Sequence, residues 1–244
     1  MSIQFVAATP DVISLAEFTD LTRNTGVITA SFWVQLNTTG AVQQIFFIEN
    51  NTGNNSRFEV QFTTGGGVQT LGRAPDSGAA INVTSSGTLS AGSLVGPNRF
   101  IVVVMNVASD QVKVYIDGVL DSTLTATFTN TATDNTTCGD LNGFGGNEGG
   151  SQPTNGYVAD LQFSHREPTA DEVLTMYNTR GKLTLLGTTD IKGRLLCNER
   201  SSGTAVTATG VLDSTKAKLL GNCIASSGSP TYRKNYMVPR KRAA

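Results

Sequence analysis

Residues 111–120 carry the clearest information about the fold, and they read QVKVYIDGVL. Apolar and polar side chains alternate over residues 111–116, and a period of two is typical of a β-strand with one buried face. Asp117 and Gly118 follow directly, and both residue types tolerate the positive φ angles that a two-residue hairpin turn needs. The stretch therefore predicts two antiparallel strands joined by a tight turn.

Further strands are predicted on both sides of this hairpin. In residues 57–62 every second side chain is apolar, which separates an apolar face from a polar face that carries Glu59 and Gln61. Residues 134–156 are rich in Asp, Asn, Gly and Thr and are predicted to be a loop. The other predicted strands cover residues 30–36, 43–49, 99–107, 123–133 and 156–163.

A short helix is predicted near residues 169–179. Thr169 is a suitable N-cap, and Glu172, three residues later, completes a capping box. Val173, Met176 and their neighbours supply a short apolar stripe. Many short strands with one short helix predict an all-β chain that folds as a two-sheet antiparallel jelly-roll sandwich.

Five motifs occur in a defined order along the chain. The first four are Ser31-Phe-Trp33, the apolar run 100–105, the hairpin turn at 117–118, and Gly145-Gly146. The fifth consists of Gly156, Tyr157, Asp160, Arg166, Thr169 and Glu172 and leads into the helix. This order resembles the laminin-G-like, concanavalin A-like jelly-roll superfamily over residues 1–180. The resemblance implies the same sandwich, as it is found in phage virion proteins.

The C-terminal part of the chain fits that pattern in an unusual position. Residues 193–221 resemble the segment with which members of the superfamily usually begin, although here it stands last. Our hypothesis is that residues 190–225 return to complete the sheets, because neighbouring chain termini permit such a rearrangement. We therefore predict a single laminin-G-like domain over residues 1–232 and a basic tail over residues 233–244.

The net charge is −1, but the charges are unevenly distributed. Residues 233–244 hold five basic residues and no acidic one, which leaves residues 1–232 with a net charge of −6. The tail is either a solvated terminus or a docking segment for an acidic partner. Aromatic and apolar residues lie among the charges, which favours a protein over nucleic acid as that partner. The docking candidates are Arg233, Lys234, Tyr236, Arg240, Lys241 and Arg242.

We do not expect an enzyme. A retaining glycosidase needs two carboxyl groups about 5–5.5 Å apart, and acids on one strand face meet this need at alternate positions. No two acidic residues of this chain are two positions apart. A Ser-His-Asp triad would need His165, the only histidine, which lies at a predicted strand end beside Ser164 and is expected on the surface. His165 also completes no recognisable four-ligand zinc pattern, so no zinc site is expected.

One Gly-rich loop has the chemistry for a ligand or a calcium ion. Asp134, Asp140, Asn142 and Glu148 lie in it, and their oxygen atoms suit a hard cation. A metal-free loop is the alternative, and no other cofactor is expected. Trp33 and Tyr157 could stack on a sugar ring, but both lie in predicted strands and are expected in the core.

These observations favour a phage virion structural protein, such as a capsid decoration, fibre or tail-associated protein. The first residues lack a signal peptide, and no apolar run is long enough to span a membrane. We therefore expect assembly in the host cytoplasm, with other virion proteins or with further copies in a symmetric homo-oligomer. The alternative is a carbohydrate-binding lectin or adhesin module, with or without calcium. The two can coexist, because a virion protein can bind host surface glycans.

Overall fold

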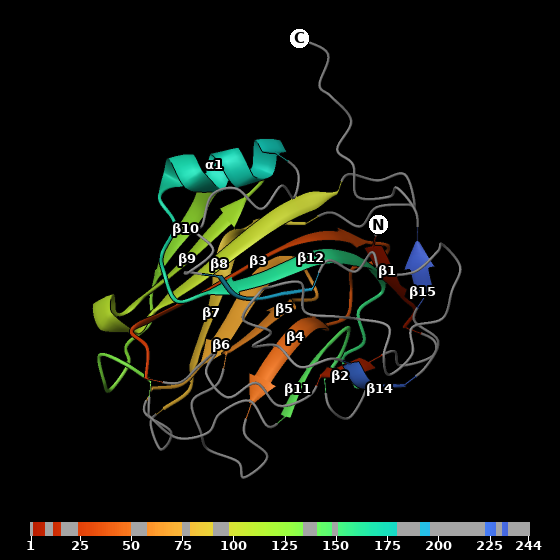
Figure 1. Cartoon of the computed structure of the whole chain (residues 1–244), viewed down its shortest axis with the longest axis horizontal. Coiled ribbons are helices and arrows are strands. Elements are labelled where there is room, and N and C mark those ends of the chain that lie inside the picture. Colours follow the sequence, from red (N-terminus) through yellow and green to blue (C-terminus); the bar gives the residue numbers. More distant parts are fainter. Residues whose placement is uncertain are drawn as a thin grey trace.

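The computed structural model (Figure 1) describes residues 2–7, 12–15, 24–49, 58–74, 79–89, 98–133, 141–147, 151–179, 191–195, 223–227 and 231–233. Within these ranges the secondary structure is almost entirely β, with one α-helix, α1 (Ala170–Thr179), and one 3-10 turn at Val107–Ser109. No helix of the described residues is long and apolar enough to cross a membrane.

The strands form two sheets, and every strand pair in the described ranges is antiparallel. Sheet A has the order β10 (Val119–Thr125), β9 (Gln111–Ile116), β8 (Arg99–Asn106), β3 (Val27–Leu36), β12 (Gly156–Ser164), β1 (Ser2–Phe5) and β15 (Thr231–Arg233), and β13 (Ile191–Leu195) also pairs with β12. Sheet B has the order β14 (Cys223–Ser227), β2 (Val12–Leu15), β11 (Leu141–Phe144), β4 (Gln43–Glu49), β5 (Phe58–Phe62), β6 (Gly67–Gly72) and β7 (Ile81–Thr88). The predicted two-sheet jelly-roll sandwich is thus confirmed.

The main core lies between the sheets and is rich in phenylalanine. Phe46 of β4 makes edge-to-face contacts with Phe32 of β3, Phe58 of β5 and Phe163 of β12, with ring centroids 6.3, 5.2 and 5.1 Å apart. These rings come from both sheets, and each is at most 2% exposed. Aromatic contacts of this kind add specific geometry to the burial of apolar area. They therefore fix how the two sheets face each other.

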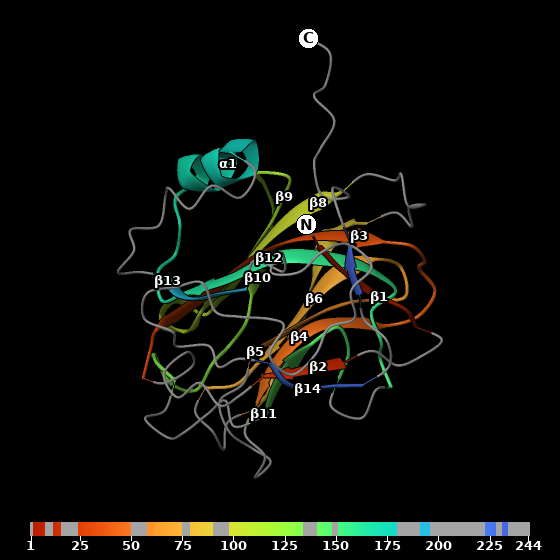
Figure 2. The ribbon, with the colours of Figure 1, turned by 45° about the vertical axis from the view of Figure 1, so that its right-hand side comes forward.

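A second apolar cluster covers the outer face of sheet A. Trp33 stacks on Tyr177 of α1 with ring centroids 5.8 Å apart and contacts Phe100 at 5.0 Å. Val173 and Met176 of α1 join this cluster, so the helix lies on the sheet (Figures 1 and 2). Tyr157 is also part of it and is 1% exposed. The expected core role of Trp33 and Tyr157 is confirmed, but their core is the one under the helix.

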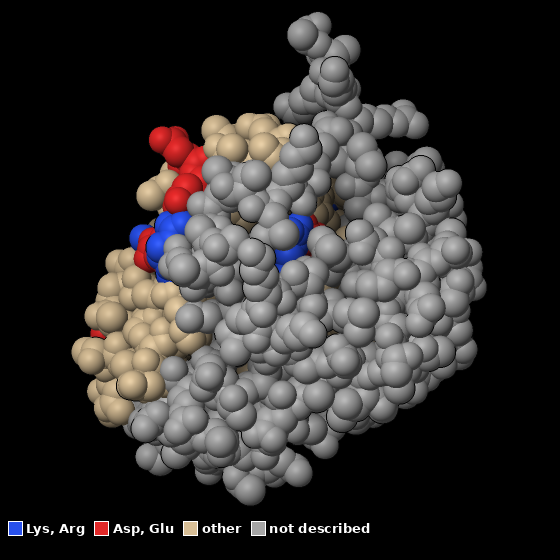
Figure 3. Space-filling model, in the orientation of Figure 1, with Lys and Arg blue, Asp and Glu red and all other residues tan. Residues whose placement is uncertain are grey.

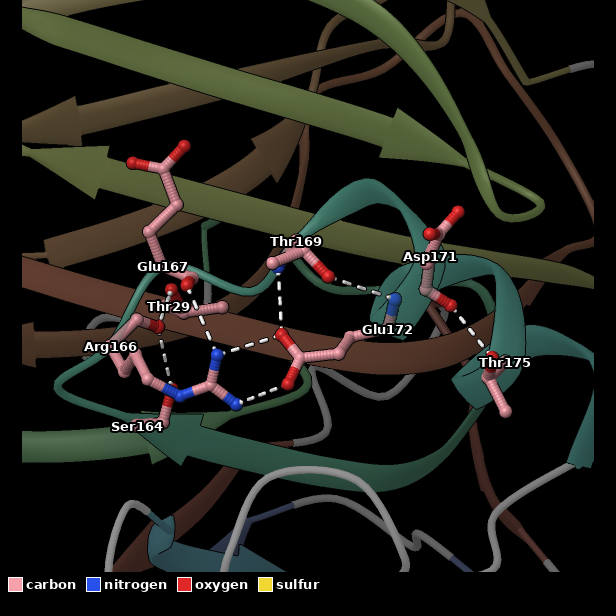
Figure 4. A network of polar contacts seen from close by, with 8 residues as sticks. All are labelled: Thr29, Ser164, Arg166, Glu167, Thr169, Asp171, Glu172 and Thr175. Carbon is pink, nitrogen blue, oxygen red and sulfur yellow. Dashed lines mark hydrogen bonds and ion pairs between the residues drawn. The ribbon is translucent and has the colours of Figure 1, made fainter.

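The helix is attached to sheet A by the predicted capping box. Glu172 N–H donates to Thr169 Oγ1 at 3.2 Å, and Thr169 N–H donates to Glu172 Oε2 at 2.8 Å. The Arg166 guanidinium donates to both oxygens of Glu172, at 2.7 and 2.9 Å (Figure 4). Thr29 and Ser164 donate their hydroxyls to the Arg166 carbonyl. The start of α1 is therefore tied to β3 and β12.

The segment before the helix is held by a second charged group. Glu167 accepts from Lys113 at 2.5 Å and from Asn106 at 2.8 Å. Burial opposes ionisation of Glu167, but these two donors outweigh it and hold the pKa of its carboxyl below the ordinary value. The hydrogen bond to Glu167 likewise raises the pKa of Lys113. Both groups are charged at neutral pH and lock the α1 segment onto β8 and β9.

The predicted hairpin turn between β9 and β10 is confirmed. Asp117 and Gly118 have φ angles of 53° and 86°. The Asp117 carboxylate accepts from the Phe100 N–H at 2.9 Å and from Arg99 at 2.6 Å. The aspartate therefore does more than tolerate the turn, because it fastens the hairpin to β8.

Two of the predicted boundaries are wrong. The strand predicted over residues 123–133 corresponds to β10, which begins at Val119 and ends at Thr125. The chain then leaves the sheet because Asp110 accepts from the backbone N–H groups of Ala126 and Phe128. The loop predicted over residues 134–156 contains β11, which pairs with β4 through all four of its residues and with β2 through three of them. So short a strand with a central glycine shows no alternation that could predict it.

Three C-terminal strands add to the two sheets. β14 pairs with β2 in sheet B, β15 pairs with β1, and β13 pairs with β12 in sheet A. Asp160, at a bulge of β12 with φ of 51°, accepts from Arg194 of β13 at 2.5 and 2.8 Å. Arg194 is 1% exposed, so this ion pair is buried. The single domain over residues 1–232 stays a prediction, and β15 runs across its proposed end.

Candidate functional site

The structure describes little of the sites predicted from the sequence. Arg233 ends β15, where its backbone lies opposite Ser2, and Lys234, Tyr236, Arg240, Lys241 and Arg242 lie outside the described residues. Asp134, Asp140 and Glu148 also lie outside them, whereas Asn142 belongs to β11. The placement of Asn142 in a loop is therefore wrong, because its backbone pairs with Leu15 and Ile48. No group of three or more potential metal-ligating acids, histidines or cysteines occurs in the described ranges.

The outer face of sheet B presents a row of amide side chains. The strand register places Gln44, Gln61, Gln69 and Thr84 directly opposite one another across β4, β5, β6 and β7. Gln61 points outward because its neighbours Val60 and Phe62 are fully buried in the core. We call these four residues the amide row.

Hydrogen bonds fix the orientation of these amides. The Gln61 amide donates to Gln69 Oε1, and Gln69 Nε2 donates in turn to Asn82 Oδ1 at 2.6 Å. At the other end of the row Gln44 Nε2 donates to Glu59 Oε2 at 3.0 Å. A chain of aligned amides holds its donors and acceptors in place before any ligand arrives. The row therefore has the pre-organisation of a binding surface.

Exposure increases along the row from β4 to β7. Gln44 is 2% and Gln61 8% exposed, Gln69 is half-buried, and Thr84 and Asn82 are exposed. A ligand would therefore reach the β6 and β7 end first. On the face drawn in Figure 3, charged atoms of described residues lie beside and below one end of α1, and a second basic patch lies nearer the middle of that face.

A second row runs beside the amide row and contains one aromatic ring. Phe47, Glu59, Leu71 and Asn82 lie opposite one another on β4 to β7. A Cβ atom added to Gly143 of β11 would come within 2.8 Å of the Phe47 ring, so only glycine leaves the ring this position. Both cross-strand neighbours of Glu59 are apolar, so no second carboxylate stands directly opposite it. The arrangement suits binding and does not form a glycosidase pair.

A cluster of uncharged polar groups continues the site at the end of β4. Gln43 Nε2 donates to the Thr38 carbonyl at 2.7 Å, and Gln43 Oε1 accepts from the Asn155 N–H at 2.7 Å. Asn155 Nδ2 donates to Thr38 Oγ1 at 3.1 Å. Asn37 Oδ1 is buried and accepts no hydrogen bond in the described part of the chain. Amides and hydroxyls therefore line sheet B from its loops to β7.

The sequence reasoning missed this site. It placed Glu59 and Gln61 on the polar face of their strand but drew no function from them. The available signal was glutamine at positions 44, 61 and 69, each next to an apolar residue that belongs to the core. Only the register shows that the three strands bring these glutamines into one row.

Comparison with solved structures supports the fold. A putative carbohydrate binding protein from Bacteroides ovatus has a TM-score of 0.60 at 10% identity, with 98% of this chain covering 60% of that chain. A heptameric SAP-like pentraxin from Limulus polyphemus has a TM-score of 0.51 at 13% identity, with 72% of this chain and 81% of that chain covered. The Ruminococcus gnavus IT-sialidase CBM40 bound to α2,3 sialyllactose has a TM-score of 0.50 at 16% identity, and the alignment covers 69% of this chain and 99% of that chain.

Sequence comparison identifies the family. No curated protein matches the chain in sequence. The family model for the concanavalin A-like lectin/glucanase superfamily matches residues 8–174, which is more than half of the chain. This range includes β3 and β8 of sheet A as well as the amide row of sheet B. The chain belongs to the concanavalin A-like lectin/glucanase superfamily.

Proposed function

We propose that the protein is a non-catalytic glycan-binding module that binds through the outer face of sheet B. The observation that carries this proposal is the amide row, in which Gln61 donates to Gln69 and Gln69 donates in turn to Asn82 of the neighbouring row. An amide offers a donor and an acceptor side by side and can match two neighbouring sugar hydroxyls. Two of the similar folds bear names of carbohydrate-binding proteins, which supports the proposal.

The proposed ligand is a neutral glycan. Within the two rows the one charged side chain is the carboxylate of Glu59, which would repel a sialic acid or a uronic acid. Gln44 already donates to this carboxylate, which leaves it oriented toward the row. Neutral hexose chains fit this surface better than acidic ones.

A glycan array with matched variants tests the proposal. Gln69→Ala removes the central amide of the exposed end, and we expect at least tenfold weaker binding, which is about 1.4 kcal/mol. Gln111→Ala, on β9 of sheet A, is the control and should bind like the wild type. Wild-type protein that binds no neutral glycan, or a Gln69→Ala variant that binds as well as the control, would show that the proposal is wrong.

Calcium dependence is a separate part of the proposal. Asp134, Asp140, Asn142 and Glu148 have the donor atoms for a calcium ion, although the structure describes only the backbone of Asn142 among them. If this loop holds calcium, addition of a chelator will lower both glycan affinity and thermal stability. Unchanged values after chelation would assign binding to the amide row alone.

We propose as a second function that this module is part of a phage virion, as a capsid decoration, fibre or tail-associated protein. The favouring observation is that the basic segment 233–244 follows directly from β15, an end strand of sheet A. A partner bound to it would therefore be held next to a rigid sandwich. Mass spectrometry of purified particles tests this function, and absence of the protein from particles that infect normally would contradict it.

A further inference from the structure

Exposed large apolar side chains gather at one corner of sheet A. In the described ranges four such side chains are exposed, and Val119, Leu120 and Leu174 are 65%, 46% and 43% exposed. A Cβ atom added to Gly118 would lie 3.1 Å from Leu174 Cδ1, so the β9–β10 hairpin touches α1 beside these residues. Leu120 lies opposite Tyr115, whose ring belongs to the cluster under α1. Val119 lies opposite Ile116, which packs on the main core, so its side chain points to the other face of the sheet. We call Leu120 and Leu174 the apolar corner.

One carboxylate lies beside the apolar corner. Asp171 is exposed and lies one helical turn before Leu174. Among the described residues it forms no ion pair, although its neighbour Glu172 is paired with Arg166. Asp121 is directed elsewhere, because its carboxylate accepts from the Gly87 N–H at 3.0 Å and from the Ser86 hydroxyl, both on β7 of sheet B. The corner therefore combines apolar surface with one acidic side chain that has no cationic partner in the described part of the chain.

The C-terminal tail has the complementary composition. Tyr236, Met237 and Val238 lie between a basic pair at 233–234 and a basic run at 240–242. An apolar centre between basic ends matches the apolar corner and the exposed carboxylate of Asp171 beside it. The rest of the chain carries a net charge of −6, so the tail is attracted to another copy of this chain.

The topology decides whether the tail comes from the same or from another copy. β10 and β15 are the two end strands of sheet A, six strand spacings of about 4.8 Å apart, which is about 29 Å (Figure 1). Residues 236–242 hold the apolar and basic groups, and they follow Arg233 by three to nine positions, so they reach at most about 11–32 Å from it when fully extended. Within one molecule only the last of them could reach β10, which is too few for the apolar and basic groups together.

We propose that the C-terminal tail of one copy docks on the apolar corner of a second copy. The apolar corner and Arg233, where the tail begins, lie at opposite edges of sheet A, so the contact joins different surfaces of the two copies. Such head-to-tail contacts repeat and give a closed ring or an open chain. This inference goes beyond glycan binding, because it uses sheet A and leaves the amide row of sheet B open.

Sedimentation velocity on full-length variants tests this contact. The corner variant carries Leu120→Asp and Leu174→Asp, and the tail variant carries Arg240→Glu, Lys241→Glu and Arg242→Glu. We expect concentration-dependent assembly of the wild type, and at least tenfold weaker assembly of each variant. Thr125→Asp, an exposed change at the far end of β10, is the matched charge control and should assemble like the wild type. Thermal unfolding shows that each variant remains folded.

Mixing the two variants separates docking from a general loss of solubility or fold. The corner variant keeps an intact tail and the tail variant keeps an intact corner, so the mixture should form a heterodimer and stop there. A wild type that stays monomeric at every concentration, a tail variant that assembles normally, or a mixture without heterodimer would overturn the proposal. Glycan binding by the corner variant should match the wild type, so failure of one proposal is distinguishable from failure of the other.

Discussion

The outer faces of the two sheets differ although both sheets are built from alternating strands. On sheet A the outward side chains include Trp33, Phe100 and Tyr157, and α1 buries them as a second core. On sheet B the outward positions hold Gln61, Gln69 and Asn82, which bond to one another. One face of each sheet thus builds the common core. The outer face can either pack under a further element, as on sheet A, or carry polar side chains, as on sheet B.

The two faces also use charge differently. Sheet A carries ion pairs that fix secondary structure, such as Arg166 with Glu172 and Lys113 with Glu167. The two rows on sheet B hold uncharged amides around one carboxylate, Glu59. Ion pairs hold a fixed partner, whereas amides can exchange one uncharged hydrogen-bonding partner for another at little net change in free energy. The comparison thus predicts large losses of stability on sheet A and small ones on sheet B.

The largest effect is expected from Trp33→Ala. The change removes a ring that is 3% exposed and packs on Phe100 and Tyr177, and we expect unfolding to become easier by about 3–5 kcal/mol. Gln61→Ala on sheet B should lower the free energy of unfolding by less than about 1 kcal/mol. Urea unfolding monitored by circular dichroism measures both. Equal losses for the two variants would show that the two outer faces do not differ as described.

A smaller loss is expected from Asp160→Asn. Asparagine accepts the φ of 51° at this position, but it leaves the Arg194 guanidinium buried without its counter-charge. We expect a loss of about 3 kcal/mol in the free energy of unfolding. The double variant Asp160→Asn with Arg194→Met should recover part of this loss, because no charge then stays buried. A double variant less stable than the single one would contradict this account of β13.

The smallest effect on sheet A is expected from Glu172→Gln. Hydrogen bonds from Arg166 hold the pKa of the Glu172 carboxyl below its ordinary value of 4.5. Its stabilising contribution is therefore complete above pH 4.5 and is lost as the pH falls through the lowered folded-state pKa. At pH 7 the free energy of unfolding of the variant should be about 1 kcal/mol lower than that of the wild type, because the substitution weakens both the helix cap and the ion pair with Arg166.

The same variant also tests the sign of this pH dependence. As the pH falls through the folded-state pKa of Glu172, the wild type loses the ionised carboxylate, and the stability difference from the variant should shrink. Urea unfolding at pH 7 and at pH 3 measures the two differences. A difference that grows on acidification would contradict the assignment.

The prediction from sequence succeeded where a local interaction decides the structure. The capping box of Thr169 and Glu172 and the Asp117-Gly118 turn each depend on residues within a few positions of one another. The prediction failed at β11 and beyond Thr125, where hydrogen bonds to residues distant in the chain determine the backbone conformation. Asp110 ends β10 by capturing two backbone N–H groups, and no pattern in residues 123–133 contains that information.

By itself, the sequence determined the all-β class, the hairpin at 117–118, the helix near 169–179 and the polarity of alternate side chains. These features follow from backbone φ preferences, capping and the period of two, which act over short stretches of chain. Only the tertiary structure decided which outer face became a second core and that Gln44, Gln61 and Gln69 stand in one row. The physical reason is that strand register and sheet order join residues far apart in the chain, and short-range preferences do not specify those pairings.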